Sequence, residues 1–281
     1  MSLGIVVKGS EGIVLAADSR VTLFVQVQAA PGTPPALSPA NFDNATKLLR
    51  VTGQHYVGAV TFGIGALLTT SGPRTMHSFI PEFEAELSDS DRLPVKEFSE
   101  KLSAFFLDRW NGLHKGPKTA GQNIEFIVGG YDQGEAYGRV YLFKIPEAPA
   151  PIEQSAGPGE FGMTFGGQGE MVHRLLAGFD PGLVGFLTQE FALDAGQAAA
   201  IAGKLSARFP NLVPFQFLPL QDCVDMATFF IQGTISLQRF SVGIRGVGGR
   251  VDVATITPAG FTWVAQKAIG CAAPLNSREG Q

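Results

Sequence analysis

The chain has 281 residues, of which 45% are hydrophobic, and it carries 21 lysines and arginines against 25 aspartates and glutamates. This length and apolar content exclude a disordered protein and favour one domain over residues 1–281. The formal net charge of −4 excludes a basic surface for nucleic acid or an anionic membrane. The longest nearly apolar run, residues 57–68, is too short to span a bilayer, and the N-terminus lacks a secretory signal pattern. Cys223 and Cys271 are too few for a disulfide framework, so we expect a cytoplasmic protein.

The first part of the chain is predicted to consist mainly of strands. Apolar runs on both sides of tight turns predict strands at residues 3–7, 13–17, 47–52 and 55–62. Four prolines within residues 24–44 favour a long inserted loop, which interrupts this series of strands. A helix is expected from Ile64 toward Glu84, broken or kinked by Pro73 and Pro81.

The second part alternates helices with strands. Apolar residues at three- and four-residue steps predict helices at 94–113, 170–177, 182–191, 194–209 and 224–237. Strands are expected at 124–130, 138–145 and 163–166, and a closing hairpin at 250–256 and 260–264. This order favours an α+β fold with helices on the outer faces of two packed antiparallel sheets, followed by a short C-terminal tail at about 270–281.

The N-terminal segment carries the most specific motif of the chain. Residues 4–22 read Gly-Ile-Val-Val-Lys-Gly-Ser-Glu-Gly-Ile-Val-Leu-Ala-Ala-Asp-Ser-Arg-Val-Thr. They resemble the opening of proteasome β-type subunits and their bacterial relatives, in which a strand hairpin ends in Ala-Ala-Asp-Ser-Arg-x-Thr. Residues 47–65, 125–143 and 251–261 resemble later strands of that family more loosely. The resemblance implies the fold of the N-terminal-nucleophile (Ntn) hydrolases, a four-layer αββα sandwich.

The resemblance also implies a nucleophile. In this family the first residue of the mature chain, usually Thr, attacks a peptide carbonyl, and the motif Asp lies sixteen positions after it. Counting back sixteen positions from Asp18 reaches Ser2. Removal of Met1 would give Ser2 both a hydroxyl and a free α-amine, whose ordinary pKa of roughly 7.7 to 8 lets it act as the base near neutral pH.

Further site residues follow from the same resemblance. It assigns to Lys47 the cation that lowers the pKa of the amine, and to Asp18 the carboxylate that holds Lys47 in place. Backbone amides near Gly63 would supply the oxyanion hole. Val21 and Thr22 fall where the family aligns the substrate backbone as an added strand.

Three features depart from the family pattern. Lys47 lies 29 positions after Asp18, farther than is usual, so residues 24–44 are interpreted as an insertion beside the active site. Ser2 replaces the commoner Thr and lacks the β-methyl that restricts χ1, which predicts a slower nucleophile. The Ser and Asp that normally support the amine have no clear counterparts in residues 166–169 or 240–243, where Ser241 could substitute only in part.

The resemblance implies a threonine/serine-type N-terminal-nucleophile peptidase that hydrolyses peptide bonds of peptides or unfolded proteins and assembles as a homo-oligomeric ring. The alternatives are a non-catalytic ring or scaffold subunit of the same fold and a small-molecule amidase of the superfamily. We expect no cofactor, metal, nucleic acid or membrane partner, and the sequence does not identify a regulator such as an ATPase. The glycine clusters at 166–169 and 246–249 lack the Lys of a phosphate loop and are predicted to be turns. The four histidines, which have no metal-ligand spacing, are His55, His77, His114 and His173.

Overall fold

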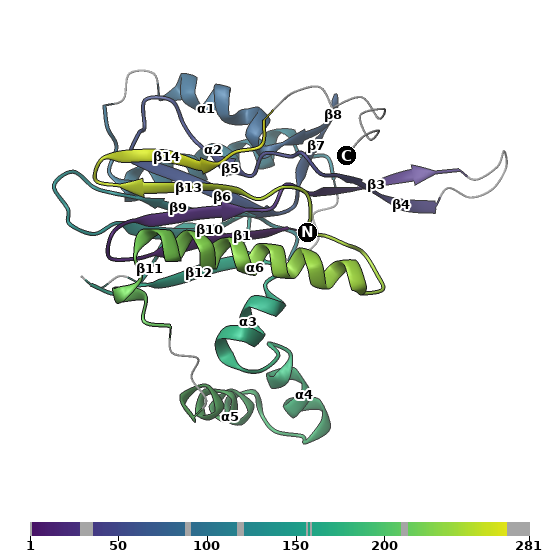
Figure 1. The fold of residues 1–281 in the computed structure, drawn as a ribbon. Coiled ribbons are helices and arrows are strands. Elements are labelled where there is room, and N and C mark those ends of the chain that lie inside the picture. The colour runs from purple at the N-terminus through teal and green to yellow at the C-terminus, as the bar shows by residue number, and fades with distance from the viewer. Residues whose placement is uncertain are drawn as a thin grey trace, which may run out of the picture.

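A computed structural model describes residues 2–28, 36–87, 91–116, 121–155, 157, 159–208 and 213–268. Within these ranges the protein is a mixed α+β structure with antiparallel sheets and six α-helices (Figure 1). The helices are α1 (Ile80–Glu86), α2 (Val95–Leu113), α3 (Glu170–Ala177), α4 (Leu183–Glu190), α5 (Ala195–Arg208) and α6 (Leu220–Phe240). None of these helices combines the length and the apolar character needed to cross a membrane.

The strands form two five-stranded sheets and two separate ribbons. In spatial order, the first sheet contains β12 (Gly162–Gly167), β1 (Leu3–Lys8), β2 (Ile13–Ala17), β13 (Asp252–Thr257) and β14 (Gly260–Ala265). The second sheet contains β11 (Ala148–Gln154), β10 (Arg139–Ile145), β9 (Ile124–Gly130), β6 (Val57–Gly63) and β5 (Leu48–Leu49). The ribbons pair β3 (Val21–Val27) with β4 (Ala36–Phe42), and β7 (Ala66–Thr69) with β8 (Gly72–Thr75).

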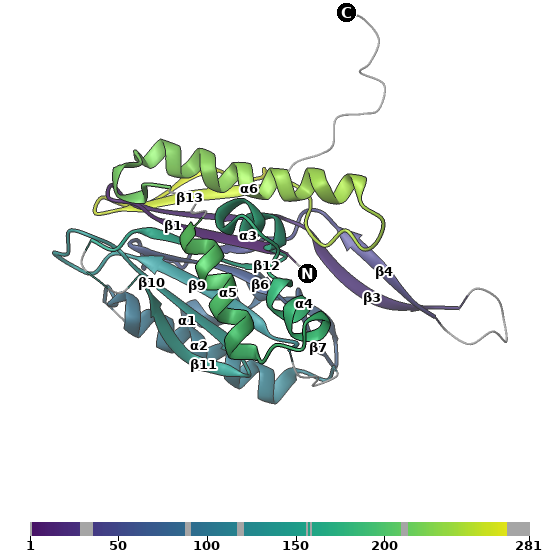
Figure 2. The same cartoon turned by 90° about the horizontal axis from the view of Figure 1, so that it is seen from below.

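Three apolar clusters form the core. One joins α1 and α2 to the second sheet and is rich in phenylalanine, including Phe106 and Phe126. Another joins α6 to the first sheet and includes Ile231 of the helix and Val14 of β2. The third fills the space between the two sheets. In Figure 2, α6 lies on one side of the sheets and α1 and α2 lie on the other.

Several predicted elements are confirmed. β1 and β2 form the expected hairpin, and every residue of both strands is buried because one face contacts α6 and the other contacts the second sheet. The amphipathic pattern of residues 94–113 corresponds to α2, and the closing hairpin corresponds to β13 and β14. Hydrophobic periodicity therefore located the elements that carry the core.

The loop predicted over residues 24–44 is wrong for its described part. β3 and β4 pair from Val21 opposite Phe42 to Val27 opposite Ala36, and this ribbon extends away from the sheets (Figure 2). Pro39, opposite Phe24, is tolerated because each strand of a two-stranded ribbon has an edge that needs no hydrogen-bond donors. Residues 29–35 lie outside the described residues, as do Met1 and the predicted tail at 270–281.

The helix expected from Ile64 toward Glu84 is also wrong over its first part. β7, β8 and a 3-10 turn (η1, Met76–Phe79) occupy that stretch, and Gly72 at φ +116° forms the turn between the strands. The helix α1 begins only at Ile80, where Pro81 fits the first turn because the N–H that it lacks has no partner within a helix. β11 was missed because its sequence contains Pro149 and Pro151, which an edge strand accommodates.

The buried thiol of Cys223 on α6 gives a first test of this packing. Burial, together with the nearby charges of Asp222 and Glu11, raises the pKa of Cys223 to about 11. A Cys271→Ser protein is therefore expected to resist a thiol reagent at pH 8 and to react with one equivalent after denaturation. The double variant with Cys223→Ser controls for background, and stoichiometric labelling of native Cys271→Ser protein would contradict the packing around α6.

Candidate active site

Asp18 is the most fully satisfied polar side chain of the candidate site. It follows β2 and is 0% exposed. Its Oδ1 accepts hydrogen bonds from the Leu3 N–H at 3.0 Å and from the Lys47 ammonium at 2.7 Å. Its Oδ2 accepts from the N–H groups of Arg20 and Gly248, both at 3.0 Å. Four donors, one of them a cation, therefore hold the carboxylate at the end of the β1–β2 hairpin.

Lys47 forms a buried ion pair with Asp18, although the two residues are 29 positions apart. It precedes β5, is 5% exposed, and its carbonyl accepts a hydrogen bond from the Thr61 N–H of β6 at 2.9 Å. Burial lowers the pKa of Lys47, and the charge of Asp18 opposes this effect. The structure thus brings together two of the residues that the sequence selected, across the insertion.

Ser2 lies immediately before β1 and is 1% exposed. Its carbonyl accepts a hydrogen bond from the Gln168 N–H at 2.8 Å. Gly167, the residue before Gln168, has φ +89°. A Cβ at this position would lie 1.9 Å from the Ser2 carbonyl oxygen, so only glycine fits. The glycine cluster at 166–169, predicted to be a turn, therefore holds the main chain of Ser2.

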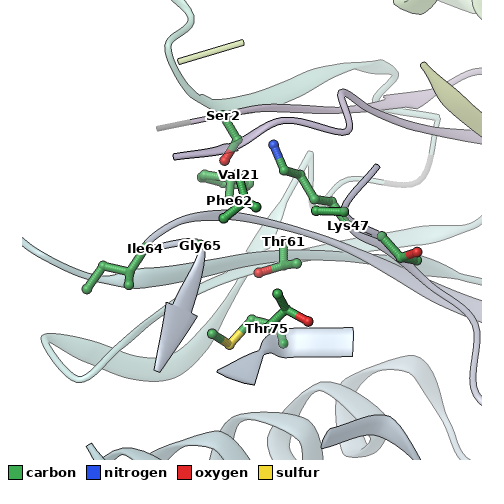
Figure 3. A pocket seen from close by; sticks show the side chains of 11 residues that line it. Ser2, Val21, Lys47, Thr61, Phe62, Ile64, Gly65 and Thr75 are labelled. Carbon is green, nitrogen blue, oxygen red and sulfur yellow. The ribbon is translucent and has the colours of Figure 1, made fainter. Parts of the chain in front are cut away.

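Ser2 and Lys47 line the same small pocket (Figure 3). Its volume is about 10 Å³, which leaves room for about one water molecule. The buried Thr61 hydroxyl on its wall has no hydrogen-bond partner among the described residues. The other lining residues are Val21, Ala45, Thr46, Phe62, Ile64, Gly65, Thr75 and Met76.

Gly63 ends β6 with φ +82°, and a Cβ there would lie 2.2 Å from the carbonyl oxygen of Asn123. It is not among the residues that line the pocket, whereas the next two residues are. The Ile64 N–H donates to that Asn123 carbonyl at 2.9 Å, while the Gly65 N–H has no acceptor among the described residues. Gly65 is therefore one backbone donor of the pocket lining that no acceptor among the described residues occupies.

Val21 and Thr22 occupy different positions relative to the pocket. Val21 is buried and lines it, in close contact with Gly65, where an added Cβ would lie 2.3 Å from Val21 Cγ2. Thr22 does not line the pocket, and its hydroxyl donates to Asn41 Oδ1 on β4 at 2.7 Å. Only the first of the two therefore borders the space beside Ser2.

Sequence reasoning missed the segment 245–250 as part of this site. Besides the bond from Gly248 to Asp18, the Ser19 hydroxyl donates to the Arg250 carbonyl at 2.6 Å. Arg20 donates to both carboxylate oxygens of Asp43, at 2.5 and 2.7 Å. The glycines at 246–249 were the signal in the sequence, but they were predicted to form only a turn.

Ser241 is not among the residues that line the pocket. It is exposed beyond the end of α6, and its hydroxyl donates to the Leu237 carbonyl at 3.0 Å. It therefore does not provide the support for the amine that the sequence suggested. Among the described residues, no group of three or more His, Cys, Asp or Glu side chains could hold a metal ion.

No model of a known protein family matches the chain, and no curated protein matches it. The geometry around Ser2, Asp18 and Lys47 is therefore the basis on which a function can be argued.

Proposed function

We propose that this protein is a proteasome-like N-terminal-nucleophile hydrolase that cleaves peptide bonds in the cytoplasm after removal of Met1. The proposal includes the four-layer αββα sandwich of that family. The observation that carries it is the common pocket of Ser2 and Lys47, with the ammonium of Lys47 paired to the buried Asp18. This supports the proposal because Ser2, which would carry both the hydroxyl and the prospective α-amine, lines the same pocket as the lysine that would supply the cation.

The chemistry follows from these groups. The neutral α-amine of Ser2 would take the proton of its own hydroxyl as Oγ attacks the substrate carbonyl. Lys47 would stabilise the developing alkoxide and disfavour protonation of the amine. The Gly65 N–H is the backbone donor proposed for the oxyanion. Collapse of the intermediate would release the amine product with that proton and leave an ester on Ser2, which water then hydrolyses.

The ribbons beside the pocket suggest how an extended peptide would bind. β3 pairs only with β4, and β7 only with β8, so within the described chain each keeps one edge without a strand partner. Val21 of β3 and Gly65, just before β7, meet at the pocket. A peptide added as a strand at this edge would bring its carbonyl toward Ser2.

The test combines the mass of the native N-terminus with hydrolysis of fluorogenic peptides. The proposal expects a chain that starts at Ser2 and releases the fluorophore. Retained Met1 without hydrolysis would reject the enzyme and favour the second candidate, a non-catalytic ring subunit of the same fold. The absence of Ser241 from the described pocket lining favours this second candidate.

The pocket volume predicts a preference for small side chains. A space for about one water molecule accommodates Gly or Ala beside the attacked carbonyl more readily than Leu or Phe. In a peptide series that varies only this residue, kcat/KM is expected to fall roughly tenfold or more between Ala and Leu. Met76→Ala, which enlarges the pocket, should reduce this ratio, whereas Met226→Ala on α6 should not. Equal rates for Ala and Phe peptides would contradict this subsite.

We also propose that the chain forms a homo-oligomeric ring. Large apolar side chains are exposed on the β3–β4 ribbon and on α6, including Phe24, Phe42, Phe229 and Phe240. Monomers rarely leave many such side chains in water, so we expect several subunits per particle in light scattering at micromolar concentration. A monomer under these conditions would shift the balance toward the small-molecule amidase.

A further inference from the structure

The β3–β4 ribbon has two unlike faces. In an antiparallel pair, residues directly opposite each other share a face, and successive residues of each strand alternate between the two faces. The register of Val21 opposite Phe42 through Val27 opposite Ala36 therefore defines one set of side chains, called here the ribbon face. Its members are Val21, Leu23, Val25, Val27, Ala36, Ser38, Ala40 and Phe42. Ser38 is the only polar residue among them.

The opposite face of the ribbon is more polar. Thr22 lies there opposite Asn41 and donates a hydrogen bond to its side-chain oxygen, and Phe24 lies opposite Pro39. Apolar residues on one face and polar residues on the other are typical of a strand pair whose apolar face is covered by protein. The sequence of the ribbon therefore calls for a surface that covers the ribbon face.

The described part of the chain leaves most of the ribbon face in water. Val21, at the base of the ribbon, is buried, but Val25, Val27 and Phe42 are 42%, 47% and 56% exposed. Figures 1 and 2 agree that the ribbon points away from the two sheets. A two-stranded ribbon by itself is only marginally stable in water, so a partner that covers this face would stabilise it.

The composition of the ribbon restricts the chemistry of that partner. Residues 21–42 contain no Asp, Glu, Lys or Arg, although 16% of the whole chain is charged. An uncharged surface has no attraction for phosphate groups or for a charged peptide. An apolar protein surface that also lacks charge is the partner that fits the ribbon face.

The outer side of α6 is a surface of this kind. Phe229, Leu237 and Phe240 are 56%, 45% and 85% exposed, and they are called here the helix stripe. They lie eight and eleven residues apart, close to two and three helical turns, so they project from one side of α6. Residues 226–238 contain no charged residue.

Every copy of the chain carries one ribbon face and one helix stripe. A contact between two unlike surfaces is heterologous, and it generates a closed ring when the rotation between copies closes. In such a ring each contact covers one ribbon face and one helix stripe, so neither remains in water on any copy. A foreign partner on the ribbon would leave the helix stripe exposed, which favours a second copy of this chain.

We propose that the ribbon face of one copy docks on the helix stripe of the next copy. The inference rests on the ring in the proposed function, and it names the two surfaces that form the contact. Val21 belongs both to the ribbon face and to the lining of the Ser2 pocket. The contact between copies therefore continues into the wall of the candidate site.

Sedimentation velocity across a range of protein concentrations tests the contact. Val25→Asp/Val27→Asp places two charges on the ribbon face and is expected to raise the dissociation constant between copies by about 30-fold or more, as loss of an interface hot spot does. Leu237→Asp on the helix stripe should act in the same way. Phe24→Asp, on the opposite face of the ribbon, and Ile152→Asp, on the edge strand β11, change equally exposed apolar residues and should leave assembly unchanged. Near-UV circular dichroism verifies that each variant is folded.

Cross-linking identifies which surfaces meet. In a Cys223→Ser/Cys271→Ser background, a chain with both Val25→Cys and Leu237→Cys should give a ladder of multimers with a short bis-maleimide. Either cysteine alone should give only monomers on a denaturing gel. Dimers from Val25→Cys alone would mean that ribbon meets ribbon, and a link within one chain would mean that the ribbon folds onto its own helix. Both results would overturn the inference.

The same measurements separate this inference from the proposed function. An oligomer that persists unchanged in Val25→Asp/Val27→Asp protein rejects the contact and leaves the ring in place. A wild-type monomer rejects the ring and the contact together. An oligomer that forms the expected cross-links but cleaves no peptide confirms the contact and favours the non-catalytic ring subunit.

Discussion

Ser2→Ala is expected to reduce peptide hydrolysis by at least about 10³-fold, because it removes the only hydroxyl that shares a residue with the prospective N-terminal amine. Fluorogenic peptide cleavage at neutral pH measures this loss. The free energy of unfolding should change by less than about 1 kcal/mol, since the substitution removes one oxygen and keeps the main-chain bond from Gln168. Circular dichroism during thermal unfolding checks this second expectation.

Two variants sharpen the test. Ser10→Ala, in the partly exposed β1–β2 turn, removes the same hydroxyl elsewhere and should leave the rate unchanged. Ser2→Thr keeps the nucleophile and adds a β-methyl that restricts χ1, so its rate should equal or exceed that of the wild type. Full activity in Ser2→Ala protein would mean that another group performs the reaction.

The elements that carry the core could be predicted because their apolar residues recur with a clear period. α2 and the β1–β2 hairpin are examples, the first from its helical spacing and the second from two continuous apolar runs. The β3–β4 ribbon and β11 could not, because their prolines counted against a strand. Only the position of these strands at an edge makes proline acceptable, and no local pattern reveals an edge.

In the candidate site, likewise, some residues could be predicted from the sequence and others could not. The motif around Asp18 pointed to Lys47, and the two side chains do meet. The contributions of Gly248 and Gly167 were not predicted, because both act through the main chain. A glycine that donates an N–H or allows a close approach has the same one-letter pattern as a glycine in an ordinary turn.

Asp18→Asn and Lys47→Ala are each expected to cause a large loss of rate, and the double variant should lose little more. The reason is the single ion pair at 2.7 Å, through which the two residues act as one unit on the Ser2 amine. The kcat/KM values of the two single variants and the double variant, measured at one pH, give the coupling directly. Additive losses would mean that the two residues act independently.

The same pair predicts an effect on stability. Asp18 and Lys47 are both almost completely buried, so removal of either partner leaves an uncompensated charge and should cost about 3–5 kcal/mol in the free energy of unfolding. Denaturant titration measures this cost, and the double variant should recover part of it.

Lys8→Ala separates stability from catalysis. Lys8 is equally buried on β1, and its ammonium donates to the Ser155 carbonyl at 2.8 Å, outside the pocket. This variant should lose stability and keep its rate per folded molecule, because it leaves the charges around Ser2 unchanged. If instead Lys47→Ala protein hydrolyses peptides at the normal rate while Asp18 remains in place, the ion pair would serve only to close the end of the β1–β2 hairpin. The likeness to the proteasome motif would then extend to structure and not to chemistry.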